Sequence, residues 1–463
     1  MKNRYLDLIE QTFEFPQEEF RVENDELLFN GIRLMDIIKE YGTPLKITYL
    51  PKIGSQISKA RGYFQQAFQK TGYKGNYTYT YCTKSSHFSF IIEEALKHGV
   101  HLETSSAYDI QIIRKLAERG AISKDTFINC NGYKRDLYKQ WICELINEGF
   151  QNVVPSLDNM SELKYYQENI TGKCKLGIRI ACEEEPTFAF YTSRLGIRYT
   201  DIINFYQSNI AGDSRFELKM LNFHINTGIK DNSYYWNELR KCINVYCDLR
   251  KICPSLDSLS IGGGFPIKTS LNFEYDYAYM AEEIVTQIKQ RCDELNIDVP
   301  NLYSEFGSFT VGESGAAIYA VLDQKQQNDR EMWYMIDSSL ITTLPDTWGI
   351  NQRFILLPVN QWGNEYRSVN IGGLTCDSLD YYDSESHNNQ VFMPKTGEGE
   401  TLYIGFFHTG AYQESLGGYG GIQHCLIPAP QHVVIRKDEN GKITTERFSK
   451  EQQPETMLHH LGY

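Results

Sequence analysis

The sequence contains the stretch Tyr79-Thr80-Tyr81-Cys82-Thr83-Lys84-Ser85-Ser86, in which a single lysine ends a short run of aromatic and β-branched residues. Such a run is typical of a buried strand, and a helical pattern over residues 88–97 follows at once. The lysine is either a solvated charge at the strand end or a buried amine whose pKa is lowered, so that it can form a Schiff base. The rest of the chain decides between these interpretations.

Composition limits the classes of function. The chain has 463 residues, of which 41% are hydrophobic and 13% aromatic, so it is globular and long enough for two domains. Its net charge of -13 argues against nucleic-acid binding, because no basic field is available to neutralise phosphates. No apolar stretch is long enough to span a membrane and no signal-peptide core is visible, which predicts a cytoplasmic protein.

Metal-ligand spacings are not found in the sequence. The 11 cysteines include no CxxC pair, and the 10 histidines include no HExxH motif. We therefore expect no structural metal and no disulfide framework, with most cysteines acting as small buried hydrophobic residues.

Strand-like and helix-like segments alternate through the first two thirds of the chain, which is the pattern of a (β/α)₈ TIM-like barrel. The expected strands are 45–49, 76–82, 126–129, 152–154, 175–180, 218–223, 258–261 and 302–305. The expected helices are 53–69, 107–119, 134–148, 160–168, 233–252 and 277–292.

A second, all-β domain is expected after the barrel, where the pattern changes to short strands and turns at 317–321, 331–336, 397–407 and 432–437. Residues 1–44, with an acidic helix-like start and a hairpin pattern at 26–32, are expected to join this domain. The predicted division is residues 1–44 for the N-terminal segment, 45–315 for the barrel and 316–463 for the C-terminal β domain.

Chemistry in such a barrel lies at the carboxyl ends of the strands. His224 ends one strand, where it is either structural or a flat ring for stacking, and Thr227 offers a hydroxyl nearby. Gly262, Gly263 and Gly264 follow another strand, forming either a tight turn or a backbone cradle for phosphate. Glu305 ends a third among apolar neighbours, so it needs a cation or a ring N–H as partner.

These four features have complementary chemistry. A lysine for an imine, a stacking histidine, a phosphate cradle and a carboxylate for a pyridinium nitrogen together describe a site for pyridoxal phosphate. The combination is far more specific than any of its members.

Several motifs resemble a known family, the pyridoxal-phosphate decarboxylases of the alanine-racemase-like fold, which act on arginine, ornithine, lysine or diaminopimelate. The biosynthetic arginine decarboxylases are the most similar branch, over residues 40–430. The motifs are Cys130-Asn131-Gly132-Tyr133-Lys134, Leu344-Pro345-Asp346-Thr347-Trp348-Gly349-Ile350, Thr375-Cys376-Asp377-Ser378, Gly405-Phe406-Phe407 and Gly410-Ala411-Tyr412-Gln413-Glu414.

The resemblance implies a role for each site residue. Lys84 would carry the cofactor, His224 would stack on its ring and Glu305 would pair with its nitrogen. The residues implied to hold the phosphate are Gly262, Gly263, Gly264, Gly307 and Tyr412, and Thr227 and Ser308 are further cofactor-binding positions. Cys376 would be the general acid, and Asp346 and Asp377 would bind the distal cation of the substrate. Glu103 occupies a position where the family carries an acidic residue near the cofactor.

The resemblance also implies partners. It points to decarboxylation of L-arginine to agmatine on the route to spermidine and other polyamines, by a homodimer with shared active sites or a higher oligomer built from it. Mg²⁺ is suggested as a second cofactor by the resemblance alone. Ser308 stands where most members have a phosphate-binding arginine, and the family's arginine decarboxylases are longer. Ornithine, lysine or meso-diaminopimelate as substrate, or a non-catalytic regulatory homologue, are the alternatives.

Overall fold

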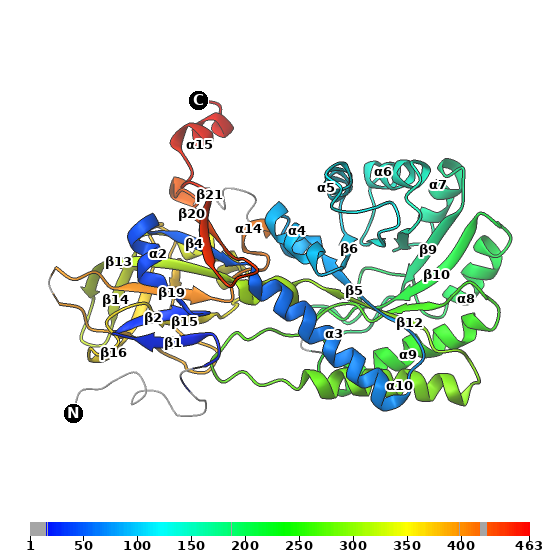
Figure 1. The fold of residues 1–463 in the computed structure, drawn as a ribbon, viewed down its shortest axis with the longest axis horizontal. Coiled ribbons are helices and arrows are strands. Elements are labelled where there is room, and N and C mark those ends of the chain that lie inside the picture. Colours follow the sequence, from blue (N-terminus) through cyan, green and yellow to red (C-terminus); the bar gives the residue numbers. More distant parts are fainter. Residues whose placement is uncertain (1–14, 16, 187, 398, 417–423) are drawn as a thin grey trace. The chain divides into compact units, whose positions relative to one another are not determined.

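The structure is a computed structural model that describes residues 15, 17–186, 188–397, 399–416 and 424–463, drawn in Figure 1. The chain divides into two compact units. The barrel unit comprises residues 53–266 and 275–310, and the sheet unit comprises the residues up to 52 together with 267–274 and 311–463. Each unit is described separately.

The barrel unit contains a closed barrel of parallel strands, which confirms the predicted (β/α)₈ class. The strands follow one another around the barrel in chain order, with the last pairing the first. They are β5 (Tyr77–Cys82), β6 (His101–Thr104), β7 (Ile128–Cys130), β8 (Val153–Leu157), β9 (Cys174–Arg179), β10 (Phe216–Asn222), β11 (Ser258–Ser260) and β12 (Asn301–Phe306).

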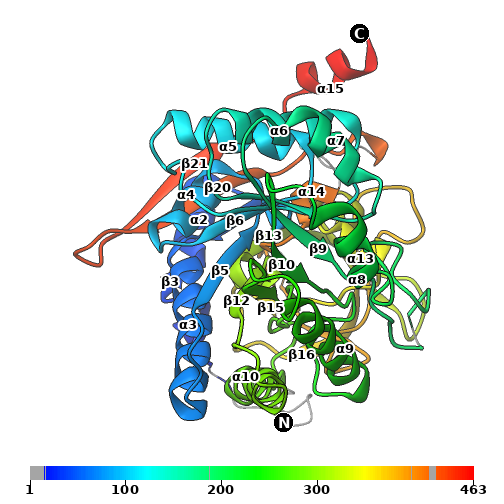
Figure 2. The same ribbon diagram turned by 90° about the vertical axis from the view of Figure 1, so that its right-hand side faces the viewer.

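Helices surround these strands, as Figure 2 shows. They are α3 (Pro51–Thr71), α4 (Ser89–Lys97), α5 (Ala107–Glu118), α6 (Asp136–Asn147), α7 (Glu162–Asn169), α8 (Ile202–Phe205), α9 (Ser233–Arg250) and α10 (Tyr277–Glu294). Helix α3 shows why they pack there. Its residues Ile53, Ile57, Ala60, Phe64 and Ala67 recur every three or four positions and are all buried, which gives the helix one apolar face.

One barrel strand differs from the prediction. Segment 45–49, expected in the barrel, forms β4 (Leu45–Tyr49) in the sheet unit, where it pairs with two strands of that sheet. The place in the barrel is taken by β6, whose sequence His101-Leu102-Glu103-Thr104 carries a charged residue inside the barrel and lacks an apolar run. A search for apolar patterns detects β4 and overlooks β6, because β6 buries the carboxylate of Glu103 where an apolar side chain would be expected.

The sheet unit is built mainly from strands, as predicted. A ten-stranded sheet has the main order β17-β16-β14-β13-β4-β20-β21, and β1, β2 and β3 form a separate three-stranded sheet. The bounds are β1 (Phe20–Glu23), β2 (Glu26–Phe29), β3 (Ile32–Arg33), β13 (Gly315–Gln326), β14 (Met332–Ile336), β15 (Ile355–Pro358), β16 (Tyr366–Gly372), β17 (Tyr381–Tyr382), β18 (Val391–Pro394), β19 (Tyr403–Phe407), β20 (Gln431–Lys437) and β21 (Ile443–Ser449).

The large sheet has a core on each face. Successive residues of β13 alternate between them, with Ala316 and Ile318 in one apolar cluster and Ala317, Tyr319 and Val321 in the other. This is the period of two that a strand buried on both faces imposes. Short helices complete the unit: α2 (Leu34–Tyr41), α12 (Leu340–Thr343), α13 (Pro345–Gly349), α14 (Gln413–Leu416) and α15 (Pro454–Leu461).

The acidic helix-like start expected at the N-terminus falls mainly on residues 1–14 and 16, which lie outside the described residues. Among the described residues, no helix combines the length and the apolar character needed to cross a bilayer.

A fully buried ion pair fixes one side of the barrel. Lys134 Nζ lies 3.1 Å from Glu162 Oε2, and neither side chain is more than 2% exposed. The same ammonium donates hydrogen bonds to the backbone oxygens of Gly132 and Ser156. Lys134 thereby joins the loop after β7 to the end of β8 and the start of α7.

Lys134→Met is expected to destabilise the protein by about 3–5 kcal/mol, because it leaves the Glu162 carboxylate buried without its cation. Adding Glu162→Leu should restore part of that loss, since no uncompensated charge then remains. Chemical denaturation of the three proteins measures both effects. A single variant as stable as the wild type would show that this pair is not needed for the fold.

Candidate active site

Lys84 lies in the turn Thr83–Ser85 directly after β5. Its ammonium Nζ is 2.5 Å from Glu103 Oε2 on the neighbouring strand β6, where the carboxylate is completely buried while the lysine side chain is 40% exposed. The parallel register pairs Cys82 with Glu103, which brings the residues that follow β5 to this carboxylate. Lys84 is thus an accessible amine oriented by a buried acid, not a loose charge at a strand edge.

Glu305 lies one residue before the end of β12 and is buried inside the barrel. Asn129 Nδ2 and Ser260 Oγ each donate to its Oε1 over 2.8 Å, Asn131 Nδ2 donates to its Oε2 over 2.8 Å, and Asn222 Nδ2 also donates to Oε1. Burial raises the pKa of Glu305, the negative charge of Glu103 adds to the rise, and the Ser260 hydrogen bond opposes it. A cation at this carboxylate would relieve the cost of its burial.

His224 follows β10 and is neutral at physiological pH. Burial lowers its pKa to about 3, and the charges of Arg179 and Lys84 add to the shift. The nearby Thr227 Oγ1 is buried with no hydrogen-bond partner among the described residues. A neutral flat ring beside an unsatisfied hydroxyl suits an aromatic ligand that carries hydrogen-bonding groups.

The glycines in the loops after β10 and β11 lie so close to other backbone atoms that a side chain would not fit. A Cβ on Gly263 would overlap the carbonyl oxygen of Glu305, and one on Gly228 would lie 2.8 Å from the carbonyl oxygen of Gly264. Gly262, at φ +69°, adopts a backbone conformation that side chains disfavour. The loops after β10 and β11 therefore approach each other through bare backbone, which is the arrangement that cradles an anion.

Gly307 and Ser308 follow β12. A Cβ on Gly307 would lie 3.0 Å from Ser85 Cβ, so Gly307 packs against the turn that carries Lys84. Ser308 begins the short helix α11 (Ser308–Val311) and supplies a hydroxyl but no charge. These positions fit a phosphate held by backbone N–H groups and a hydroxyl more than by a cation.

The barrel unit thus brings together several predicted residues. A Cβ on Gly262 would lie 3.2 Å from His224 Nδ1, and one on Gly263 would overlap the Glu305 carbonyl oxygen. Gly307 packs against the turn of Lys84, which brings the amine, the ring and the carboxylate to the same end of the barrel. Together with the backbone cradle, this donor set fits pyridoxal phosphate, and their individual roles remain predictions.

Four supporting residues were missed in the sequence. Asn129, Asn131, Asn222 and Ser260 surround Glu305. Part of the signal was available, because Asn222 and Ser260 are the last residues of β10 and β11, each two positions before a predicted site residue, His224 or Gly262. Arg179, a buried cation at the end of β9, was also missed.

The remaining predicted residues belong to the sheet unit. Asp346 is buried, and Gln413 Nε2 donates to its Oδ2 over 2.8 Å. Asp377 Oδ1 accepts a hydrogen bond from the Leu379 N–H. Cys376 is exposed, with its Sγ 3.4 Å from Cys425 Sγ. Tyr412 adopts a left-handed conformation at φ +68° just before α14. Their contribution to the active site remains a prediction.

The fold and the barrel site together define a barrel protein built to hold pyridoxal phosphate. The family model "pyridoxal-dependent decarboxylase, pyridoxal binding domain" matches residues 54–312, more than half of the chain. The chain belongs to this family of pyridoxal-dependent decarboxylases, and its cofactor is pyridoxal phosphate.

Relatives span nearly the whole chain. A biosynthetic arginine decarboxylase of Prochlorococcus marinus is 22% identical over 566 aligned positions, covering 95% of this chain and 86% of the relative. Arginine decarboxylase 2 of Arabidopsis thaliana is 21% identical, covering 91% of this chain and 74% of its own. An alignment longer than 463 residues means that the relatives carry segments that this chain lacks.

Solved structures share the fold. The biosynthetic arginine decarboxylase SpeA from Campylobacter jejuni superposes with a TM-score of 0.80 at 22% identity, covering 96% of this chain and 89% of that one. The diaminopimelate decarboxylase from M. jannaschii superposes with a TM-score of 0.78 at 16% identity, covering 94% and 96% of the two chains.

Gly263→Ala is expected to weaken pyridoxal phosphate binding by about tenfold or more, because the added methyl group forces apart backbone that is already in contact. Gly212→Ala is the matched control, since a Cβ there meets no atom within 4 Å. Titration of the cofactor absorbance measures both affinities. Equal affinities in the two variants would remove the glycine loop from cofactor binding.

Proposed function

We propose that the protein decarboxylates L-arginine to agmatine and carbon dioxide. The observation that carries the proposal is the pair of carboxylates Asp346 and Asp377, on the two sheet-unit motifs that resemble the arginine branch. A guanidinium is planar and always charged, and carboxylates are its best partners. Relatives that cover most of the chain and are named arginine decarboxylases support the same substrate.

Barrel residues hold and tune the cofactor. When bound, pyridoxal phosphate accepts the electron pair left on the substrate carbon as carbon dioxide departs. Lys84 Nζ would hold the cofactor, with Glu103 orienting the ammonium. Glu305, kept in place by four donors, would pair with a cationic ring nitrogen, and neutral His224 would offer its flat face.

Cys376 Sγ is the proton donor to the substrate carbon. The hydrogen bond with Cys425 raises the pKa of the Cys376 thiol, and the charge of Cys425 adds to the shift. A thiol with a raised pKa stays protonated at neutral pH, as a general acid must. Asp377, next in the chain, binds the far end of the same substrate.

Asp346 supports a cationic substrate in a second way. Burial raises the pKa of its carboxyl, and the hydrogen bond from Gln413 opposes the rise. An incoming guanidinium would stabilise the charged carboxylate. Meso-diaminopimelate presents a carboxylate at its far end, which two aspartates would repel. Ornithine and lysine keep a distal cation, so they are the nearer rivals.

We also propose that the protein acts in the cytoplasm as a homodimer with shared sites. All 11 cysteines are free, two of them exposed, which suits a reducing compartment. In the family resemblance, the Cys-Asp pair comes from the neighbouring subunit, so a monomer would lack a complete site.

Carbon dioxide release by the holoenzyme from arginine, ornithine, lysine and meso-diaminopimelate, measured side by side, tests the proposal. We expect release from arginine at the highest kcat/KM. A preference for another substrate would reassign Asp346 and Asp377. No release from any of them would favour the non-catalytic regulatory homologue.

Asp377→Asn should raise KM for arginine by roughly tenfold or more, because a neutral amide replaces a charge-assisted partner of the guanidinium. The control is Asp329→Asn, an exposed aspartate of the same unit. Steady-state kinetics of the two variants give the comparison. An unchanged KM would exclude Asp377 from the substrate site.

Co-expression of a Lys84→Ala chain and a Cys376→Ala chain with different tags should yield a hybrid dimer with about half of the wild-type activity. One of its two shared sites is intact, and the other carries both defects. Each variant alone serves as the control. If the hybrid is no more active than the Cys376→Ala dimer, the cysteine acts within its own chain.

A further inference from the structure

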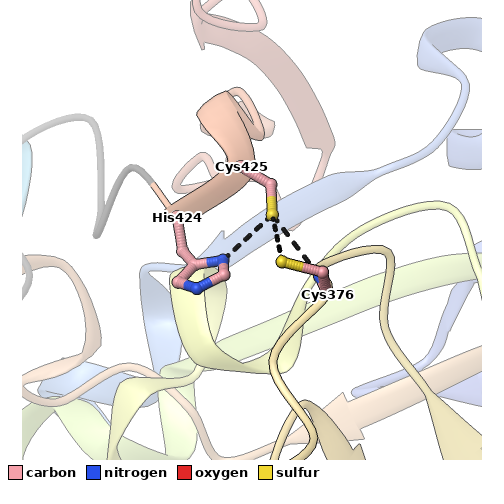
Figure 3. A group of neighbouring side chains, drawn as sticks. All are labelled: Cys376, His424 and Cys425. Atoms are coloured by element: carbon pink, nitrogen blue, oxygen red, sulfur yellow. Dashed lines mark hydrogen bonds between the residues drawn. The ribbon is translucent and has the colours of Figure 1, made fainter.

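Three metal-ligating side chains meet in the sheet unit. Cys376 lies in the loop between β16 and β17, and His424 and Cys425 begin the turn His424–Leu426. One ligand atom from each residue lies within 4.8 Å of the other two. Figure 3 shows the imidazole and both sulfurs pointing toward one another. Spacing rules could not find this group, because 49 positions separate the two cysteines.

The distances between the ligand atoms are slightly shorter than those of a tetrahedral metal site. Zn–S bonds of about 2.3 Å and Zn–N bonds of about 2.0–2.1 Å place two sulfur ligands about 3.8 Å apart and a sulfur and a nitrogen about 3.6 Å apart. The structure has 3.4 Å between Cys376 Sγ and Cys425 Sγ, and 3.1 Å between Cys425 Sγ and His424 Nδ1. A shift of a few tenths of an ångström opens the group to the size of the ion.

A carboxylate lies beyond the imidazole. His424 Nε2, the ring nitrogen away from Cys425, lies 4.0 Å from Asp377 Oδ2. A carboxylate beyond a ligating imidazole fixes the tautomer of the ring and strengthens it as a ligand. Asp377 lies on that side of the ring, farther than a hydrogen bond would reach.

The backbone at the group is strained. Cys425 and Leu426, with φ of 54° and 53°, are two consecutive side-chain-bearing residues in the left-handed region. Such conformations cost about 1–3 kcal/mol each and cluster at binding sites, where the surroundings hold them. Here the strained turn presents the Cys425 sulfur to Cys376.

Solvent access distinguishes this pair from the other cysteines. Nine of the eleven cysteines are buried, and Cys376 and Cys425 are the two exposed ones. A metal can therefore reach their sulfurs without any unfolding of the core. Thiolate and imidazole ligands together select zinc over magnesium or calcium, which prefer oxygen.

We propose that Cys376, His424 and Cys425 form a zinc-binding site, with water in the fourth position. Binding converts both thiols to thiolate ligands and releases their protons to solvent, with no change of oxidation state. This departs from the expectation of no metal drawn from the sequence. A consequence that rests on the proposed function is inhibition, since zinc occupies the Cys376 sulfur that donates the proton.

Metal binding is tested on the reduced holoenzyme, desalted to remove free pyridoxal phosphate, which would itself bind zinc. Competition with a chromophoric chelator gives the zinc affinity, and Co²⁺ in place of zinc reports thiolate ligation through its charge-transfer absorption. We expect one zinc per chain, with the affinity about tenfold or more lower in Cys425→Ser and His424→Asn. His459→Asn, an exposed histidine of α15, is the matched control.

Any one of three results would overturn the site. The first is wild-type zinc affinity in both site variants, and the second is cobalt binding without a thiolate absorption band. The third is a disulfide between Cys376 and Cys425 in the isolated protein, with no metal uptake once that disulfide has been reduced.

Decarboxylation is a separate measurement, taken relative to the metal-free rate of each protein. We expect zinc to inhibit the wild type over the concentration range in which it binds. Equal inhibition of His424→Asn should require a zinc concentration about ten times higher. Binding without inhibition would leave the metal site standing and contradict Cys376 as the proton donor. Inhibition unchanged in His424→Asn would place the inhibitory zinc elsewhere and overturn the regulatory consequence.

Discussion

Burial of the Glu305 carboxylate is the constraint on which the barrel site depends. A charge inside a barrel is costly unless its oxygens are hydrogen-bonded. Asn129 and Asn131 supply donors from β7 and its following residue, Asn222 from β10 and Ser260 from β11. Strands far apart in the chain are thereby held in one register around one carboxylate, which is fixed before any ligand arrives.

The electrostatics of the site follow from this arrangement. Glu103 and Glu305 place two carboxylates inside the barrel, and a cation close to either one would stabilise its charged form. Lys84 forms an ion pair with Glu103. The pKa of Glu305 is raised, and a cationic ring nitrogen beside it would stabilise its charged carboxylate. In the arrangement proposed here, the phosphate of such a ligand would meet glycine backbone and Ser308.

Much of this organisation could be predicted from the sequence, because alternating strands and helices have strong periods. The failures have physical causes. Segment 45–49 has the apolar alternation of a strand, but that pattern does not say which sheet the strand joins. Strand β6 was overlooked because His101-Leu102-Glu103-Thr104 contains no apolar run. Asn131 lay inside a recognised motif with its role unassigned. Cys376 and Cys425 meet only through tertiary folding, which no local spacing records.

Cys376 connects the two chemistries proposed for the sheet unit. As an acid it must keep its proton, and the hydrogen bond with Cys425 raises its pKa in that direction. As a metal ligand it must lose the proton, and the same Cys425 then supplies the second sulfur. Cys425 thus favours the protonated thiol of Cys376 without metal and the thiolate with metal bound. Cys376 cannot be in both states at once. Free zinc, by mass action, would set the fraction of chains that hold the proton.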